Sequence, residues 1–135
     1  MKVRAEKILV VILLIGFSVS SFALNVENYF VIGRHVGDSG ETGAGARRTI
    51  EFYEQGLADA FRLVATMNDN KISFGGKSYI CPPSADVITR GVVSSAIMRI
   101  IGSAERQKYS SPEELHTSVA QPAVIGLAQM FPCAK

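Results

Sequence analysis

Four consecutive residues, Gly37-Asp38-Ser39-Gly40, copy the motif around the nucleophilic serine of chymotrypsin-like proteases. The two histidines of the chain, His35 and His116, are the side chains that would serve as the general base. That chemistry also needs an acid behind the base and an oxyanion hole on a rigid scaffold. Here the motif lies in a glycine-rich stretch, and a chain of 135 residues is too short for two such barrels. We therefore expect a flexible loop at residues 37–45, and we expect that the protein is not an enzyme.

The sequence supports a metal or cofactor site no better than it supports a serine-protease site. The two histidines lie far apart, and neither has a Cys or Asp at the spacing of metal ligands. The chain has no G-x-x-x-x-G-K-[ST] phosphate loop, and no G-x-G-x-x-G motif follows a strong strand. We expect no catalytic residues, no metal and no cofactor.

The chain has two cysteines, Cys81 and Cys133, at the outer ends of two predicted helices. One helix begins just after Cys81, and the other ends just before Cys133. Two consecutive helices joined by a short turn run antiparallel, so the start of the first lies beside the end of the second. A Cys81–Cys133 disulfide would close this helical hairpin at its open end.

Residues 1–23 have the pattern of a secretory signal peptide. Basic residues precede the apolar run 8–15, and Ser21-Phe22-Ala23 supplies small residues at the cleavage positions. The apolar run is too short to cross a bilayer as a stable helix. We therefore expect a periplasmic protein without membrane attachment after cleavage, in an oxidising compartment that favours the disulfide.

Cleavage would also change the charge of the protein. Residues 1–23 contain three basic residues and one acidic residue, so their removal takes the formal net charge from +2 to zero. The +2 of the full sequence therefore belongs to the export signal and gives no argument for nucleic-acid binding. We expect no nucleic-acid partner.

Apolar residues at three- and four-residue spacing predict three helices. The first covers residues 46–67, the second runs from an N-cap at Ser84 to Gly102, and the third begins at a capping box, Ser111-Pro112-Glu113-Glu114. Pro122 should kink or divide the third helix near Val119. In each helix these apolar residues form a stripe along one face. The stripe of the first helix is Ile50, Tyr53, Leu57, Phe61 and Val64, and that of the second is Ile88, Val92, Val93, Ala96, Ile97, Ile100 and Ile101. The stripe of the third helix is Leu115, Val119, Ala123, Leu127 and Phe131.

Two stretches outside these helices are less regular. Residues 24–32 fit either a short strand or a short helix, and repeated glycines from Gly33 onward interrupt any regular element. We predict that residues 24–45 as a whole form a flexible segment. Residues 72–80 fit either a loop or a strand hairpin that turns at Gly75-Gly76. The sequence thus predicts an all-α fold over residues 46–135, a bundle of about three to four helices with a disulfide-closed C-terminal helical hairpin.

The residues around the cysteines resemble those of the Rap/Tai family of immunity proteins. Tyr79-Ile80-Cys81-Pro82-Pro83 is similar to the family's aromatic-x-Cys-x-Pro motif, and the segment that ends in Phe131-Pro132-Cys133 is similar to its apolar-Pro-Cys motif. Glu113 lies at a family position between them. Four residues of the first helix also match the family, namely Tyr53, Gly56, Asp59 and Ala60. Ile50 stands where the family often has the cysteine of a second disulfide.

The resemblance implies a helical inhibitor that protects bacteria against an amidase effector of type VI secretion. Such a protein covers the active site of a peptidoglycan amidase toxin, frequently as a homodimer, with a protruding loop in the toxin's cleft. An alternative from another class is a periplasmic stress or chaperone-like protein without a dedicated toxin partner. The polar connection between the second and third helices is the predicted contact surface, because loops on rigid scaffolds often carry recognition. Its candidate contact residues are Glu105, Arg106, Lys108 and Tyr109.

The signal-peptide pattern predicts the N-terminus of the exported protein. Mass spectrometry of periplasmic material should find Leu24, or a residue within about two positions of it, at the N-terminus. Intact Met1 in a membrane fraction would contradict this prediction.

Overall fold

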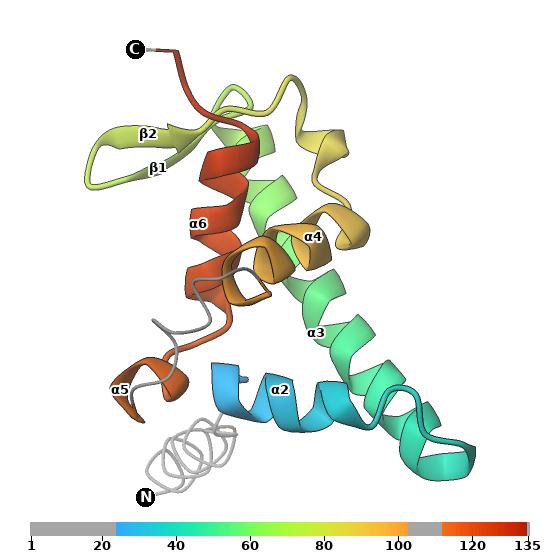
Figure 1. Cartoon of the computed structure of the whole chain (residues 1–135). Coiled ribbons are helices and arrows are strands. Elements are labelled where there is room, and N and C mark those ends of the chain that lie inside the picture. Colours follow the sequence, from blue (N-terminus) through green and yellow to red (C-terminus); the bar gives the residue numbers. More distant parts are fainter. Residues whose placement is uncertain (1–23, 103–111, 135) are drawn as a thin grey trace, which may run out of the picture.

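The computed structural model describes residues 24–102 and 112–134 (Figure 1). The predicted signal peptide and the predicted contact residues Glu105, Arg106, Lys108 and Tyr109 lie outside the described residues. The elements in chain order are α2 (Val26–Arg34), α3 (Gly40–Met67), β1 (Ile72–Phe74), β2 (Lys77–Ile80), η1 (Ala85–Val87), α4 (Arg90–Ile101), α5 (Pro112–Leu115) and α6 (Ala120–Met130). The protein is mostly helical, and one small two-stranded hairpin is the exception to the all-α prediction.

The long helix α3 packs one side against the rest of the protein. Four residues of its predicted stripe contact the core: Ile50, Tyr53, Leu57 and Phe61. The fifth, Val64, is 44 % exposed, whereas Ala58 and Ala65 are fully buried. The buried face is therefore centred on small residues, which allow the neighbouring elements to approach the helix closely.

The prediction of a flexible segment over residues 24–45 needs correction, and the short-helix alternative for residues 24–32 is confirmed. The structure has α2 there, followed by the first turns of α3. The side chain of Asn25 caps α2 by accepting a hydrogen bond from the backbone amide of Asn28 at 2.8 Å. Glu27 lies in the first turn, where the helix dipole favours an acid.

The glycines at the start of α3 permit close packing there. A β-carbon at Gly43 would clash with the backbone carbonyl of Asp38, in the turn that precedes the helix. The guanidinium of Arg47 donates a hydrogen bond to the carbonyl of Val36 at 2.7 Å, which ties the same turn to α3. These tertiary contacts offset the low helix propensity of glycine, about 1 kcal/mol per residue relative to alanine.

The strands β1 and β2 form an antiparallel hairpin, so the hairpin alternative for residues 72–80 is confirmed. Gly75 and Gly76 have φ of 58° and 79°, the left-handed conformations that a tight two-residue turn requires. Figure 1 shows the hairpin projecting sideways from the end of α6.

The predicted start of the second helix at Ser84 is wrong, and its predicted end at Gly102 is confirmed. The Ser84 side chain caps no α-helix; it precedes η1, and α4 begins at Arg90 with Thr89 as its N-cap. The side chain of Asn70 accepts a hydrogen bond from the backbone amide of Ala85 at 2.8 Å, which holds this stretch against the end of α3. The helix then ends at Gly102, as predicted.

The predicted division of the third helix near Val119 is also confirmed. The short α5 ends at Leu115, and α6 begins after Val119. Pro122 lies in the first turn of α6, where its missing amide hydrogen costs no hydrogen bond within that helix. The start of α2 packs against the break between α5 and α6. The backbone amide of Val26 donates a hydrogen bond to the carbonyl of Thr117, and the amide of Val119 donates to the carbonyl of Leu24, both at 3.0 Å.

The helices α4 and α6 cross each other in Figure 1 rather than running side by side. At the crossing, a β-carbon on Gly126 would clash with the backbone of Ala96, so the two backbones touch there. Branched aliphatic residues dominate the surrounding core. Its largest fully buried side chains are Val26, Ile72, Ile80, Ile88, Val93, Ile97, Ile101, Val119, Pro122 and Leu127.

The predicted Cys81–Cys133 disulfide is present, with 4.9 Å between the two Cα atoms. Its setting differs from the predicted helical hairpin, because Cys81 follows β2 and lies several residues before α4. The bridge therefore links the end of the strand hairpin to the residues after α6. The amide of Cys81 also donates to the carbonyl of Phe131 at 2.8 Å, and Ile80 forms a β-bridge with Pro132.

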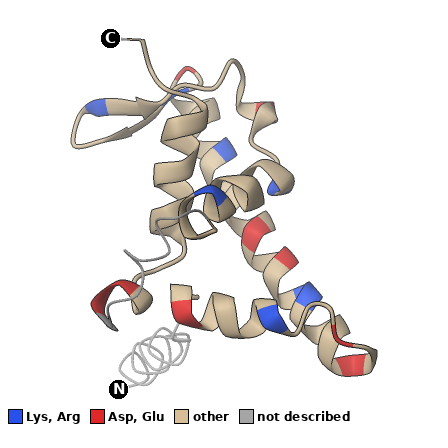
Figure 2. Cartoon of the chain, viewed as in Figure 1, with Lys and Arg blue, Asp and Glu red and all other residues tan. Residues whose placement is uncertain are grey.

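Charged residues are unevenly distributed over the surface. Figure 2 shows acidic and basic residues along α2 and the first half of α3, whereas α6 carries none. Within residues 24–102 and 112–134, no helix is long and apolar enough to cross a membrane.

The disulfide makes a strong contribution to stability in the chain-entropy model, because it spans 52 residues of the unfolded chain. We expect the Cys81→Ala, Cys133→Ala double variant to lose about 2–5 kcal/mol of unfolding free energy. Urea unfolding measures the loss, and peptide mapping under non-reducing conditions should find both wild-type cysteines in one linked pair. Two free thiols in oxidised protein would contradict the structure.

Candidate functional site

The residues of the serine-protease-like motif do not form a triad. His35 Nδ1 lies 2.7 Å from Asp38 Oδ2, and both side chains are about half exposed. Ser39 is the N-cap residue of α3, and its side chain makes no capping hydrogen bond. His116 instead pairs with Glu27 at 3.6 Å, near the opposite end of α2 from His35. In the described part of the chain, no three His, Cys, Asp or Glu side chains are grouped as metal ligands.

A hollow lies between α2, α3 and α4, in a region that the sequence motifs do not indicate. Its volume is about 770 Å³, within the range typical of small-molecule sites. The apolar part of its wall includes Phe30, Ile50 and Met98. We call this hollow the interhelical pocket.

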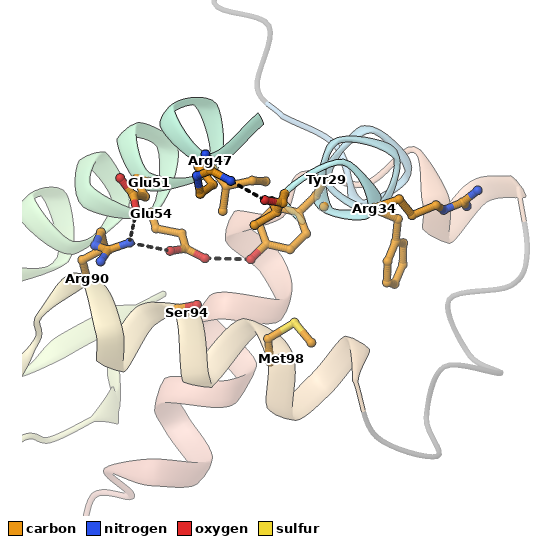
Figure 3. A pocket seen from close by; sticks show the side chains of 12 residues that line it. Tyr29, Arg34, Arg47, Glu51, Glu54, Arg90, Ser94 and Met98 are labelled. Atoms are coloured by element: carbon orange, nitrogen blue, oxygen red, sulfur yellow. Dashed lines mark hydrogen bonds and ion pairs between the residues drawn. The ribbon is translucent and has the colours of Figure 1, made fainter. Parts of the chain in front are cut away.

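A buried carboxylate forms the polar end of the interhelical pocket (Figure 3). The side chain of Glu54 on α3 is only 4 % exposed. Its Oε1 accepts a hydrogen bond from the hydroxyl of Tyr29 on α2 at 2.7 Å. Its Oε2 lies 3.8 Å from Nη1 of Arg90 on α4, and the same nitrogen lies 3.6 Å from Glu51 Oε1. One acidic side chain thus connects three helices.

The environment of Tyr29 keeps its hydroxyl protonated. Burial raises the pKa of Tyr29 well above its ordinary value, and the hydrogen bond to Glu54 and the charge of Glu54 raise the pKa further. The hydroxyl of Ser94, on the α4 side of the pocket, acts in the opposite direction. Tyr29 is therefore a stable hydrogen-bond donor to Glu54 over the physiological pH range.

Sequence patterns miss this cluster. The apolar stripe of residues 46–67 places Glu54 off the core face, yet the structure buries it. The signal available in the sequence is a row at four-residue spacing, in which Glu54 stands between Ile50 and Ala58. The partners Tyr29 and Arg90 come from other helices, so no local pattern identifies them.

A second, apolar hollow of about 440 Å³ lies between the strand hairpin and α6. Its lining includes Phe74 and Tyr79 on the hairpin and Ile125 on α6. The rings of Phe74 and Tyr79 lie 6.1 Å apart, and Nζ of Lys77 lies 5.5 Å from the centre of the Tyr79 ring. The two aromatic residues are nearly half exposed, so the hairpin presents an apolar surface with one positive charge.

Comparisons with models of protein families, with curated proteins and with solved structures found no match to this chain.

Replacement of Tyr29 by Phe removes the donor to buried Glu54. We expect the unfolding free energy at neutral pH to fall by about 1–3 kcal/mol, the usual cost of an unsatisfied buried polar group. Urea unfolding of the wild type and the variant measures the difference. An unchanged free energy of unfolding would show that Glu54 does not depend on this hydrogen bond.

The same variant should change how stability depends on pH. Tyrosines of the unfolded chain ionise near pH 10, whereas folded Tyr29 stays protonated because its pKa is raised. The folded state then holds an extra proton, so this contribution lowers stability as pH rises above about 10, by up to about 1.4 kcal/mol per unit. The Tyr29→Phe variant should lack this contribution. Tyr79→Phe, at a residue 44 % exposed, is the control and should keep the wild-type slope.

Proposed function

We propose that this protein is a periplasmic immunity protein of the Rap/Tai family. It binds a peptidoglycan amidase effector of type VI secretion and blocks the active site, without chemistry of its own. The cognate toxin would be encoded beside it, as is expected of a toxin and its immunity protein.

The meeting of the two cysteine motifs carries this proposal. The aromatic-x-Cys-x-Pro motif and the apolar-Pro-Cys motif are far apart in the sequence, and the disulfide joins them in the fold. Backbone contacts at Ile80–Pro132 and Cys81–Phe131 extend the junction beyond the sulfur atoms. Residues that resemble a family signature therefore act as one structural unit, which supports common ancestry over chance similarity.

The matching residues of the first helix divide between core and surface. Tyr53 is partly buried, and its hydroxyl lies 3.5 Å from the hydroxyl of Ser118, which links α3 to the start of α6. Gly56, Asp59 and Ala60 are exposed. Part of the resemblance thus concerns fold stability, and the rest lies where a partner can reach it.

Inhibition requires a rigid element that enters or covers the toxin's cleft. The strand hairpin is an element of this kind in the described part of the chain, because it projects from α6 and exposes Phe74 and Tyr79 (Figure 1). The connection with Arg106 and Tyr109 is the other proposed contact element. Tyrosine and arginine frequently anchor protein interfaces because they combine large contact areas with polar groups.

The chaperone-like alternative has its own structural support. The outer face of α3 exposes Phe52, Leu63 and Met67 at 75 %, 60 % and 80 %. Such an apolar surface suits transient binding of unfolded chains. It also suits the contact between two copies in the proposed homodimer. A chaperone-like protein would suppress aggregation of unrelated proteins, whereas an immunity protein would inhibit one amidase at a fixed ratio.

The predicted contact residues give a direct test against the neighbouring amidase. We expect the Arg106→Ala, Tyr109→Ala double variant to weaken toxin binding by at least about 2 kcal/mol, the threshold of an interface hot spot. Calorimetric titration measures the affinity, and amidase activity on peptidoglycan measures inhibition. The unfolding free energy should change by no more than about 0.5 kcal/mol.

Two further variants locate the contact surface. Val31→Ala removes part of an exposed apolar side chain on α2, outside both proposed contact elements, and should leave toxin affinity unchanged. If the Arg106→Ala, Tyr109→Ala variant also binds normally, the proposed contact residues are wrong, and the Phe74→Ala, Tyr79→Ala double variant tests the hairpin. A neighbouring amidase that neither binds nor is inhibited would overturn the proposed function itself.

A further inference from the structure

We propose that the interhelical pocket binds a small organic cation, with a primary ammonium group on Glu54 and an apolar body along the pocket wall. The inference does not rest on the proposed function, and neither strand of the hairpin lines this pocket. The inference comes from the incomplete pairing of one buried carboxylate and from the surfaces that surround it.

The buried carboxylate of Glu54 has acceptor capacity that its described neighbours do not use. Oε1 accepts one hydrogen bond from Tyr29. Oε2 has an ion pair with Arg90 at 3.8 Å, beyond the 2.7–3.2 Å range of good N–H···O hydrogen bonds. An ionised carboxylate accepts about four hydrogen bonds. Glu54 lines the pocket, so a donor inside the pocket can supply the missing contact.

The charges near Glu54 favour a cation over an anion. Glu51 and Glu54 share the guanidinium of Arg90, so two carboxylates face one guanidinium at the polar end, while Arg34 and Arg47 line other parts of the pocket. The guanidinium of Arg47 donates to the carbonyl of Val36. Arg34 points away from Glu54 in Figure 3. An ammonium group would form a charge-assisted hydrogen bond there, which is about twice as strong as a neutral one.

The rest of the pocket suits an apolar body. Phe30, Ile50 and Met98 line it, and methionine adapts easily to ligands of irregular shape. A volume of about 770 Å³ leaves room for a chain or ring attached to the ammonium group. The geometry therefore selects for two features together, a cationic head and an apolar body.

Three probes with the same six-carbon body separate these features: hexylammonium, hexan-1-ol and hexanoate. Titrations followed by amide chemical shifts of the purified, oxidised protein should place hexylammonium at Tyr29, Glu54, Ser94 and Met98. We expect hexan-1-ol and hexanoate to bind at least about tenfold more weakly, because neither carries the positive charge that forms an ion pair with Glu54. Equal binding of hexylammonium and hexan-1-ol, or hexylammonium shifts outside the pocket, would overturn the proposal.

Two variants test the residues. Glu54→Gln keeps the shape of the side chain and removes its charge, so it should abolish the preference for hexylammonium over hexan-1-ol. Gly33→Leu places a side chain at the pocket and should weaken hexylammonium binding at least about tenfold. Gly33 is in α2 and lines the pocket, and a β-carbon there meets no atom within 4 Å, so this variant should fold normally.

Gly56→Leu is the matched control for Gly33→Leu. Gly56 is also a helical glycine with open space around a β-carbon, but it does not line the pocket. Its hexylammonium affinity should equal that of the wild type. If Gly33→Leu binds hexylammonium as tightly as Gly56→Leu does, the interhelical pocket is not the site.

Discussion

The backbones of α4 and α6 touch where Gly126 meets Ala96, and the rest of the core is arranged around this contact. Because no side chain separates the helices at the crossing, the isoleucine-rich face of α4 and the apolar face of α6 lie close together around it. Leu127 and Ile97, next to the crossing, are fully buried. A larger residue at position 126 would push the helices apart and expose this core to water.

The disulfide and the buried carboxylate act at different ends of this core. The disulfide joins the end of the strand hairpin to the residues that follow α6. Glu54 instead holds α2, α3 and α4 together through a hydrogen bond and an ion pair. Removing an acidic side chain from water costs free energy, which its partners only offset. The main effect of the contacts of Glu54 is therefore to fix the position of α2, and their net contribution to stability is smaller.

These two regions also separate the proposed activities. In Figure 1 the hairpin projects from one end of the fold, whereas α2 lies at the other. The interhelical pocket is formed by α2, α3 and α4, and neither strand contributes to it. A cation in the pocket and a partner on the hairpin would therefore not compete for the same residues. The helix α3 connects the two regions, because it contacts β1 as well as α2 and α4.

Local patterns in the sequence determined much of this structure. The stripes of α4 and α6, the end of α4 at Gly102, the Gly75-Gly76 turn and the division near Val119 all depend on residues close together in the chain. The disulfide pairing was predictable because there are only two cysteines.

Only the tertiary structure decided the rest. The glycines before Ala46 favour an irregular segment by local propensity, but contacts with the preceding turn make this stretch helical. Glu54 resembles a surface residue because its main partner, Tyr29, lies 25 residues away on another helix. The helix α4 begins at Arg90 rather than after Ser84, and the stretch before it is held by a hydrogen bond from the backbone amide of Ala85 to the side chain of Asn70. In each case the contact joins residues that are not neighbours in a local sequence pattern. Such a contact stabilises the chain only after folding has brought the residues together.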